Sequence, residues 1–286
     1  MKFTILGGDQ RSSKLTNMLY NDNHVVKIFG FDKENIKSLE ICENLDLAII
    51  GANYIIGPVP CSKDNIYLNT PLYSGKIKLE DIFQAMNSEQ IFIAGKITNE
   101  IKEIANSYKI KTIDLLQREE MAVLNAIPSA EGAIQIAMEE TDITLHGSNV
   151  IILGFGRIGK ILAKMLQGIG ANVYVEARKY SDLAWIKSYG YIPVDLNKLG
   201  DYLKEMDIVF NTVPSMLLNE AMLLKLNKES IVIDIASSPG GVDMEKAKEL
   251  GIKVIWALGL PGKVASATSG SIIKNTIYNV IEEMGG

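Results

Sequence analysis

Short aliphatic runs alternate with amphipathic segments along the first half of the chain. We predict buried strands at Lys2–Leu6, Val25–Ile28, Leu47–Ile50, Ile91–Ile93 and Lys111–Ile113. Between them, apolar residues recur with helical spacing in Ser12–Tyr20, Lys33–Leu39, Leu79–Met86 and Asn99–Tyr108. Strands that alternate with helices indicate βαβ units and a parallel sheet. Glycine and proline punctuate residues 51–75, so we expect an irregular connection there.

A helical region follows, and the strand–helix alternation then starts again. We predict a helix over Leu115–Asn125, an interruption at Pro128, and a second helix that Ser129 caps and that runs to about Glu140. Further strands are predicted at Val150–Leu153, Asn172–Glu176, Ile208–Asn211, Ile231–Ile235 and Lys253–Trp256. A helix is predicted at Arg157–Gln167, turns at Gly259–Gly262, and a last helix from about Ser269 to Glu283.

These patterns predict an α/β protein with two doubly wound parallel-sheet domains. The first, residues 1–127, is expected to be a flavodoxin-like substrate domain, and the second, residues 128–268, a Rossmann dinucleotide-binding domain. The C-terminal helix, residues 269–286, is expected to pack back on the first domain. A chain of 286 residues suits two such cores better than one.

Composition excludes several classes of protein. A net charge of −5 provides no basic surface for nucleic acid. The two cysteines, Cys42 and Cys61, lack metal-ligand spacing, so we expect reduced thiols and no metal site. No segment reaches the roughly 20 apolar residues of a membrane span. The first residues have the pattern of a strand rather than of a signal peptide, so a cytoplasmic protein is expected.

Residues 154–159, Gly-Phe-Gly-Arg-Ile-Gly, match the G-x-G-x-x-G dinucleotide fingerprint. The match follows a predicted strand, opens a predicted helix and precedes a second strand, which is the βαβ setting that the motif requires. The glycines permit a tight turn and a close approach to the pyrophosphate, while the helix N-terminus offers amide donors. We therefore predict that Gly154, Phe155, Gly156, Arg157, Ile158 and Gly159 bind the cofactor.

The end of the second strand of this domain selects between NAD and NADP. An acidic residue there binds the ribose 2′-hydroxyl, whereas a basic residue accommodates a 2′-phosphate. The usual spacing puts Ala177 at the acidic position, followed by Arg178 and Lys179, which favours NADP. Strand alternation is expected to turn Glu176 away from the ribose. A register slip of one residue would instead place Glu176 at this position and favour NAD.

Three later strand ends carry small polar or glycine-rich loops. Asn211, Thr212, Val213 and Pro214 follow one strand, Ser237–Gly241 the next, and Leu258–Lys263 the last. Ligands of this fold bind at the carboxyl ends of the strands, so these loops are expected to converge on one pocket. We count the first four residues and Ser237 among the cofactor-binding residues, with an ordinary turn as the alternative for each loop.

Candidate substrate residues are few, because the chain has only two histidines. His24 and His146 both precede predicted strands, and we expect structural roles for them. A histidine base beside the nicotinamide, common in hydroxy-acid dehydrogenases, is therefore not expected. The substrate-binding candidates are Gly8, Arg11, Ser129 and Gly262, and the candidates for proton exchange are Glu131 and Lys263. A solvated helix start is the alternative for Arg11, and a surface position is the alternative for Glu131 and Lys263.

Several short motifs that are spread along the chain form a recognisable combination. They are Asn125–Gly132, His146–Ser148, Ala177–Arg178 with the fingerprint, Asn211–Met216, Ser238–Gly241 and Gly259–Gly262. In this combination the chain resembles the dipicolinate synthase A-subunit family over its whole length. A more distant resemblance connects it to D-2-hydroxyacid dehydrogenases. It lacks their catalytic histidine and their NAD-selecting acid, so their chemistry is not carried over.

The resemblance implies a role in spore-forming bacteria, in the mother-cell cytoplasm. It implies NADP-dependent oxidation of 4-hydroxy-tetrahydrodipicolinate, or of its dehydrated form dihydrodipicolinate, to dipicolinate, a branch of the lysine/diaminopimelate pathway. The flavoprotein-like B subunit of dipicolinate synthase is the implied partner, and a homo-oligomer is expected. Two alternatives remain open at this point. The chain is a nucleotide-binding regulatory or scaffolding subunit whose partner carries the chemistry, or it is a generic 2-hydroxyacid dehydrogenase.

Overall fold

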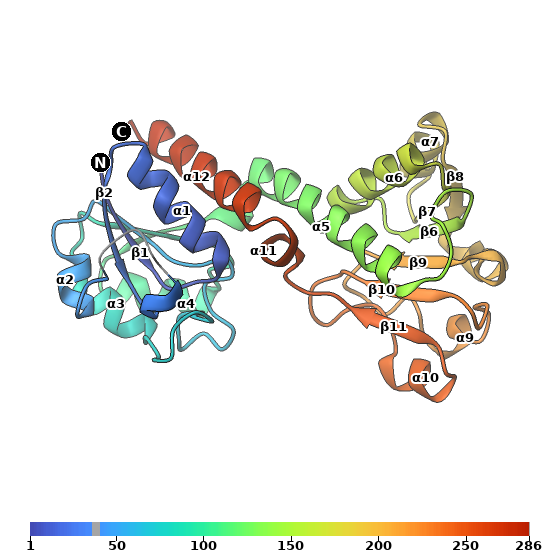
Figure 1. Cartoon of the computed structure of the whole chain (residues 1–286), viewed down its shortest axis with the longest axis horizontal. Helices are drawn as coiled ribbons and strands as arrows, with labels where there is room; N and C mark the ends of the chain where they lie inside the picture. The colour runs from blue at the N-terminus through green and yellow to red at the C-terminus, as the bar shows by residue number, and fades with distance from the viewer. Residues whose placement is uncertain (36–40, 286) are drawn as a thin grey trace. The chain divides into compact units, whose positions relative to one another are not determined.

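The computed structural model describes residues 1–35 and 41–285, which form two compact units. Unit 1 comprises Met1–Asn125 and Ala265–Gly286, and unit 2 comprises Ala126–Val264. Each unit is built on its own parallel sheet (Figure 1). Among the residues that the structure describes, no helix is long and apolar enough to cross a membrane. Over the same ranges, no group of three or more metal-ligating side chains occurs, and Cys42 and Cys61 are free thiols.

Unit 1 has a five-stranded sheet in the order β2-β1-β3-β4-β5, with every pair parallel. The strands are β1 (Lys2–Leu6), β2 (Val25–Phe29), β3 (Tyr54–Ile56), β4 (Ile91–Ala94) and β5 (Lys111–Asp114). Its helices are α1 (Gln10–Asn21), η1 (Lys33–Asn35), α2 (Leu45–Ile49), α3 (Leu79–Ala85), α4 (Asn99–Ser107), η2 (Leu115–Gln117) and α12 (Ser266–Glu283). This strand order is that of flavodoxin-like folds.

Helices cover both faces of this sheet, so consecutive strand residues enter different cores. Phe92 of β4 packs in the cluster that α3 and α4 cover, whereas Ile93 packs in the cluster that α1 and α12 cover. The terminal helix α12 lies along α1 (Figure 1). Its buried residues Ile273 and Ile277 join Leu15 and Leu19 of α1 in one cluster. The C-terminal segment thus completes the core of the unit that the N-terminus begins.

One strand predicted in unit 1 is wrong, and one predicted helix lies partly outside the described residues. The strand predicted at Leu47–Ile50 is wrong: residues Leu45–Ile49 form α2, and the third strand of the sheet is β3. The side chain of Asn44 caps α2 by accepting a hydrogen bond from Leu47 N at 2.9 Å. Leu47 and Ile50 are exposed while Ala48 and Ile49 are buried, which suits a short helix. Of the helix predicted at Lys33–Leu39, Lys33–Asn35 form a 3-10 turn, and 36–39 lie outside the described residues.

Unit 2 has a six-stranded parallel sheet in the order β11-β10-β9-β6-β7-β8, which is the Rossmann order. The strands are β6 (Asn149–Leu153), β7 (Asn172–Ala177), β8 (Ile192–Asp195), β9 (Ile208–Asn211), β10 (Ile231–Asp234) and β11 (Lys253–Trp256). Helix α5 (Glu119–Glu140) begins in unit 1 and continues into unit 2 from Ala126. The other helices of unit 2 are α6 (Arg157–Ile169), α7 (Tyr180–Ser188), η3 (Leu196–Lys198), α8 (Leu199–Tyr202), η4 (Leu203–Glu205), α9 (Glu220–Leu223), α10 (Met244–Glu249) and α11 (Leu260–Val264). The fold class predicted from the strand–helix alternation is confirmed for both units.

The helix α5 corrects a predicted break. It continues through Pro128, and Ser129 is a buried interior residue rather than a cap. Proline removes one helical hydrogen bond, but its fixed φ is itself helical. Ala130 and Ala133, on either side of the next turn, are fully buried in the core of unit 2, and this packing favours the continuous helix. The pattern also missed β8, and α11 replaces the turn predicted at Gly259–Gly262.

Candidate functional site

The connection between β6 and α6 brings the backbone of the glycine fingerprint close to its neighbours. Gly154 has φ +96°, and a Cβ there would lie 2.6 Å from Cγ2 of Val213. A Cβ on Gly159 would lie 2.1 Å from the carbonyl oxygen of Gly154. Only glycine fits at these two positions, because α6 starts directly against the loop that precedes it. The amides at the start of α6 therefore face the carboxyl edge of the sheet.

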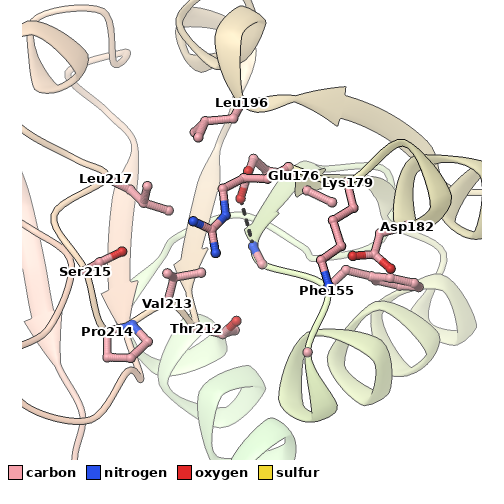
Figure 2. A pocket seen from close by; sticks show the side chains of 14 residues that line it. Phe155, Glu176, Lys179, Asp182, Leu196, Thr212, Val213, Pro214, Ser215 and Leu217 are labelled. Atoms are coloured by element: carbon pink, nitrogen blue, oxygen red, sulfur yellow. Dashed lines mark hydrogen bonds between the residues drawn. The ribbon is translucent and has the colours of Figure 1, made fainter.

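A pocket of about 360 Å³ lies at this edge, over the carboxyl ends of β6, β7 and β9 (Figure 2). Nine of its lining residues are among the predicted cofactor-binding residues: Gly154, Phe155, Gly156, Ala177, Arg178, Lys179, Thr212, Val213 and Pro214. Five others were not predicted: Glu176, Asp182, Leu196, Ser215 and Leu217. The strand order places these loops together, and sequence spacing alone gave no signal for Asp182, Leu196 or Leu217.

The remaining predicted cofactor residues do not line this pocket. Arg157 is exposed at the first turn of α6, Ile158 is half-buried, and Gly159 is buried against the fingerprint loop. Asn211 is fully buried below the loop that follows β9. Ser237 is exposed in the loop after β10.

A buried carboxylate links the strand ends of β9 and β10. Asp234 Oδ1 accepts hydrogen bonds from Asn211 Nδ2 at 2.8 Å and from Ala236 N at 3.0 Å, and Oδ2 accepts from Gly241 N at 2.9 Å. Asn211 in turn accepts from Val213 N through Oδ1 and donates to the Val213 carbonyl. Since Val213 lines the pocket, Asp234 positions one of its walls from below.

Glu176 corrects a prediction, because its side chain is not turned away from the pocket. It lines the pocket, is 2% exposed, and accepts a hydrogen bond from Gly154 N at 3.1 Å through Oε2 (Figure 2). In the sheet register Glu176 lies beside Leu153, the last residue of β6, so its carboxyl group reaches the backbone where the fingerprint begins. Burial raises the pKa of Glu176, and the Gly154 hydrogen bond and Arg178 oppose this rise.

Cationic and anionic side chains share the outer part of the pocket. Arg178 and Lys179 follow β7 directly, and Asp182 lies in the first turn of α7. Arg178 and Lys179 can both bind a phosphate, and the arginine can do so with two parallel hydrogen bonds. Figure 2 shows Lys179 and Asp182 near Phe155 on one side of the pocket, and Thr212 and Val213 on another.

The residues present fit a dinucleotide. Space is open beside Gly156, where a Cβ would meet nothing within 4 Å. The α6 N-terminus, Arg178 and Lys179 supply the positive charge that phosphates need. In addition, Glu176 Oε1 is a buried polar atom without a hydrogen-bond partner among the described residues. Such an atom at a pocket wall favours a ligand that supplies the missing partner.

The substrate candidates belong to both units. In unit 1, Gly8 lies beside Ser12 at the start of α1. Arg11 is not the solvated helix-start residue that was the alternative, since its side chain is 8% exposed. Its guanidinium pairs with Asp9, with Nη2 at 2.8 Å from Oδ2, and also donates to the carbonyl of Val59.

In unit 2, the remaining candidates lie on two helices that pack together at Gly132, whose Cβ position adjoins Leu260 and Val264. Ser129 and Glu131 are on α5, and Gly262 and Lys263 are on α11; Glu131 and Lys263 are exposed.

Neither histidine lines the pocket. Nε2 of His24 lies 3.0 Å from the hydroxyl of Tyr278, and His146 lies against Gly170. The structural roles of these two residues stay a prediction.

Two family models match the two halves of the chain. Residues 2–116 match the N-terminal domain of the dipicolinate synthase A subunit. Residues 129–247 match the NAD binding domain of D-isomer specific 2-hydroxyacid dehydrogenases. The second match supports a nicotinamide dinucleotide as the cofactor and an oxidoreductase as the class of enzyme.

Whole-chain relatives agree with both models. The A subunit of dipicolinate synthase of Bacillus subtilis (strain 168) is 32% identical over 287 residues, covering 99% of this chain and 97% of that protein. The crystal structure of the A chain of dipicolinate synthase from Bacillus subtilis aligns with a TM-score of 0.88 over 100% of this chain and 97% of that one. The corresponding structure from Bacillus halodurans gives a TM-score of 0.89 at 28% identity, covering 98% and 97%. The chain therefore belongs to the dipicolinate synthase A-subunit family.

Proposed function

We propose that this chain is the NADP-dependent dehydrogenase subunit that forms dipicolinate. The substrate is dihydrodipicolinate, or 4-hydroxy-tetrahydrodipicolinate that first loses water. The observation that carries the proposal is the whole-length relationship to a dipicolinate synthase chain. It is joined by a pocket that is lined by the basic side chains of Arg178 and Lys179 and has Ala177 at the position of the NAD-selecting acid.

Arg178 and Lys179 support NADP as the cofactor. A 2′-phosphate carries about −1.5 to −2 charge near neutral pH and three acceptor oxygens, by analogy with other phosphate monoesters. The guanidinium of Arg178 and the ammonium of Lys179 are the groups on the pocket wall that can neutralise it. The amides at the start of α6 would hold the pyrophosphate.

The overall reaction converts dihydrodipicolinate and NADP⁺ to dipicolinate, NADPH and a proton. The ring loses a hydride and a proton and becomes a pyridine, so aromatisation supplies driving force. NADP⁺ held by Arg178, Lys179 and the α6 N-terminus would supply the hydride acceptor. The protein's remaining tasks are to orient two substrate carboxylates and to accept one proton.

For these tasks we propose the residues that the sequence singled out. Arg11, with Gly8, would bind one substrate carboxylate, and Asp9 holds the guanidinium in a fixed orientation. Ser129 and Gly262 would contact the substrate, and Lys263 or Glu131 would accept the proton. Lys263 and Glu131 are both exposed, which leaves them free to reach a ligand.

The proposal includes the cellular setting that the family resemblance implies. The chain would act in the mother-cell cytoplasm during sporulation, on a branch of the lysine/diaminopimelate pathway. It would form a homo-oligomer and pair with the flavoprotein-like B subunit of dipicolinate synthase. The Bacillus subtilis relative is named as one subunit of its enzyme, which supports a multi-subunit assembly.

The test combines activity with cofactor binding. The purified chain is mixed with NADP⁺ and the lysine-pathway intermediate, and the ultraviolet absorption of dipicolinate and the appearance of NADPH are followed with and without the flavoprotein-like partner. Product in the absence of the partner supports the proposal. No product unless the partner is present would transfer the chemistry to it or to a shared site and overturn the proposal.

For the cofactor, Arg178→Ala should weaken NADP⁺ binding by about 10–100-fold, since a hydrogen bond to a charged group contributes about 1.5–3 kcal/mol. NAD⁺ binding should change by less than about twofold, because NAD⁺ has no 2′-phosphate. The control Lys187→Ala removes an equal charge at the end of α7, where the residue does not line the pocket. Equal losses for NAD⁺ and NADP⁺ in the Arg178 variant would contradict NADP selection by this residue.

A further inference from the structure

Glu176 is the only buried carboxyl group on the pocket wall among the described residues, and one of its two oxygens has no hydrogen-bond partner. Oε2 accepts the Gly154 amide, whereas Oε1 is buried and without a hydrogen bond. The hydrogen bond from the Gly154 amide orients the carboxyl group and leaves Oε1 as its unpaired oxygen. A ligand in the pocket can supply the missing partner for Oε1.

The surroundings of Glu176 hold few charges. Arg178 lies two residues later on the same strand end, and Asp195 lies at the end of the neighbouring strand β8. Lys179 and Asp182 complete the ionisable groups on the pocket wall, while β6 and β9 contribute none. Burial and Asp195 favour the neutral acid, and the Gly154 amide and Arg178 favour the ion. Burial is the largest of these influences, so the pKa of Glu176 is raised.

The protonation state decides what Oε1 can bind. Because Oε2 accepts from Gly154, the proton of the neutral acid resides on Oε1 and makes it a donor. A donor at this place complements the acceptor oxygens of a 2′-phosphate. The ionised group is an acceptor only; it repels a phosphate and accepts from a ribose 2′-hydroxyl instead.

We propose that Glu176 is a proton-gated selector of the cofactor: as a neutral acid it donates from Oε1 to the 2′-phosphate of NADP, and as a carboxylate it favours NAD. This inference rests on the proposed use of NADP. It gives the chain a cofactor preference that depends on pH, with NADP favoured most strongly at low pH. The acid that would select NAD if it were ionised thus supports NADP while it keeps its proton.

The direction in which the NADP preference changes with pH distinguishes titration of Glu176 from titration of the 2′-phosphate of the cofactor. A 2′-phosphate loses its second proton near pH 6 and then binds cations more tightly as the pH rises. Loss of the Glu176 proton acts in the opposite direction. A fall in NADP preference with rising pH therefore cannot come from the phosphate itself.

The experiment measures the dissociation constants of NADP⁺ and NAD⁺ by calorimetry over the whole range from acidic to alkaline pH in which the protein stays folded. In the unmodified protein, the preference for NADP⁺ over NAD⁺ should fall by about tenfold as the pH rises, which is the scale of effect expected when one hydrogen bond to a charged group is lost. In Glu176→Gln the side-chain amide is a permanent neutral donor, so this preference should not fall. The control Glu205→Gln removes an exposed acid outside the pocket and should follow the unmodified protein.

Infrared difference spectroscopy gives a second readout that does not depend on activity. Binding of NADP⁺ at the acidic end of this pH range should shift the carbonyl band of a protonated carboxylic acid, and Glu176→Gln should lack this band. Superposed preference curves for the unmodified protein and Glu176→Gln, or the absence of the protonated band, would overturn the inference and leave NADP use intact. Failure of NADP⁺ to bind at any pH would instead overturn the proposed function along with it. The unmodified protein's curve decides the matter even if the variant does not fold.

Discussion

Replacing Asp234 by asparagine removes one buried acceptor at the carboxyl edge of unit 2 and keeps the shape of the side chain. The carboxylate joins β9 and β10 through three donors: Asn211 Nδ2, Ala236 N and Gly241 N, all within 3.0 Å. Asp234 is 1% exposed and Asn211 is fully buried, so water does not readily replace a lost bond. The variant therefore tests whether this network positions the pocket wall.

The magnitude follows from the number of donors left without an acceptor. In Asp234→Asn, the amide oxygen can keep the bonds to Asn211 and Ala236, while the amide nitrogen faces Gly241 N from the position of Oδ2. The flipped orientation is worse, because it deprives two donors rather than one. A buried donor without an acceptor costs about 1–3 kcal/mol, so we expect a loss of about 2 kcal/mol in the free energy of unfolding. Asp234→Ala removes all three bonds and should cost about 4 kcal/mol.

Urea unfolding followed by circular dichroism measures both losses, provided that the slope of the free energy against urea is unchanged. The control Asp201→Asn changes an exposed acid of the same unit and should stay within about 0.5 kcal/mol of the unmodified protein. NADP⁺ binding should weaken in the Asp234 variants, because Asn211 holds the backbone of Val213. Stability of Asp234→Asn equal to that of the control would refute the reasoning.

Three further predictions concern Glu176, the hydrogen bond between Tyr278 and Asp22, and Arg11. The folded-state pKa of Glu176 lies above its unfolded value, so the stability that this group contributes is present at low pH and is lost as the pH rises through the folded pKa. Glu176→Gln should therefore gain stability relative to the unmodified protein in thermal melts at alkaline pH. Melting temperatures of the two proteins that change with pH in parallel would contradict this. Tyr278→Phe removes the 2.7 Å hydrogen bond to Asp22 and the 3.0 Å contact with Nε2 of His24, and should cost at least about 1 kcal/mol in urea unfolding. Hydrogen bonds from Lys274 and then from Tyr278 lower the pKa of Asp22, so the stability they contribute is present at neutral pH and is lost as the pH falls through the folded pKa. A Tyr278→Phe effect that does not become smaller in acid would refute the link. Arg11→Ala should raise the KM for substrate in steady-state assays while the NADP⁺ dissociation constant stays the same, and an unchanged KM would remove Arg11 from the substrate site.

Local sequence signals were sufficient where local geometry decides the structure. Aliphatic runs bounded by turn residues located five of the six strands of unit 2, and missed β8, where Pro193 and Asp195 interrupt the apolar pattern. The fingerprint glycines predicted the tight approach that the structure shows at Gly154 and Gly159. The run at Leu47–Ile50 was ambiguous between strand and helix, because four apolar residues suit either. The cap from Asn44 resolved it in favour of a helix.

The sequence by itself determined two parallel α/β sheets, the place of the dinucleotide loop and the cations that follow β7, because each depends on residues close together in the chain. Only the tertiary structure decided the environment of Glu176, since its partner Gly154 is 22 residues away and alternation along one strand does not reveal the neighbouring loop. It also decided that Arg11 is buried, through a carbonyl 48 residues distant at Val59. The burial of a side chain and its hydrogen-bond partners depend on which segments meet in space. Burial and these partners in turn determine the charge and the position of the groups on which the proposed chemistry depends.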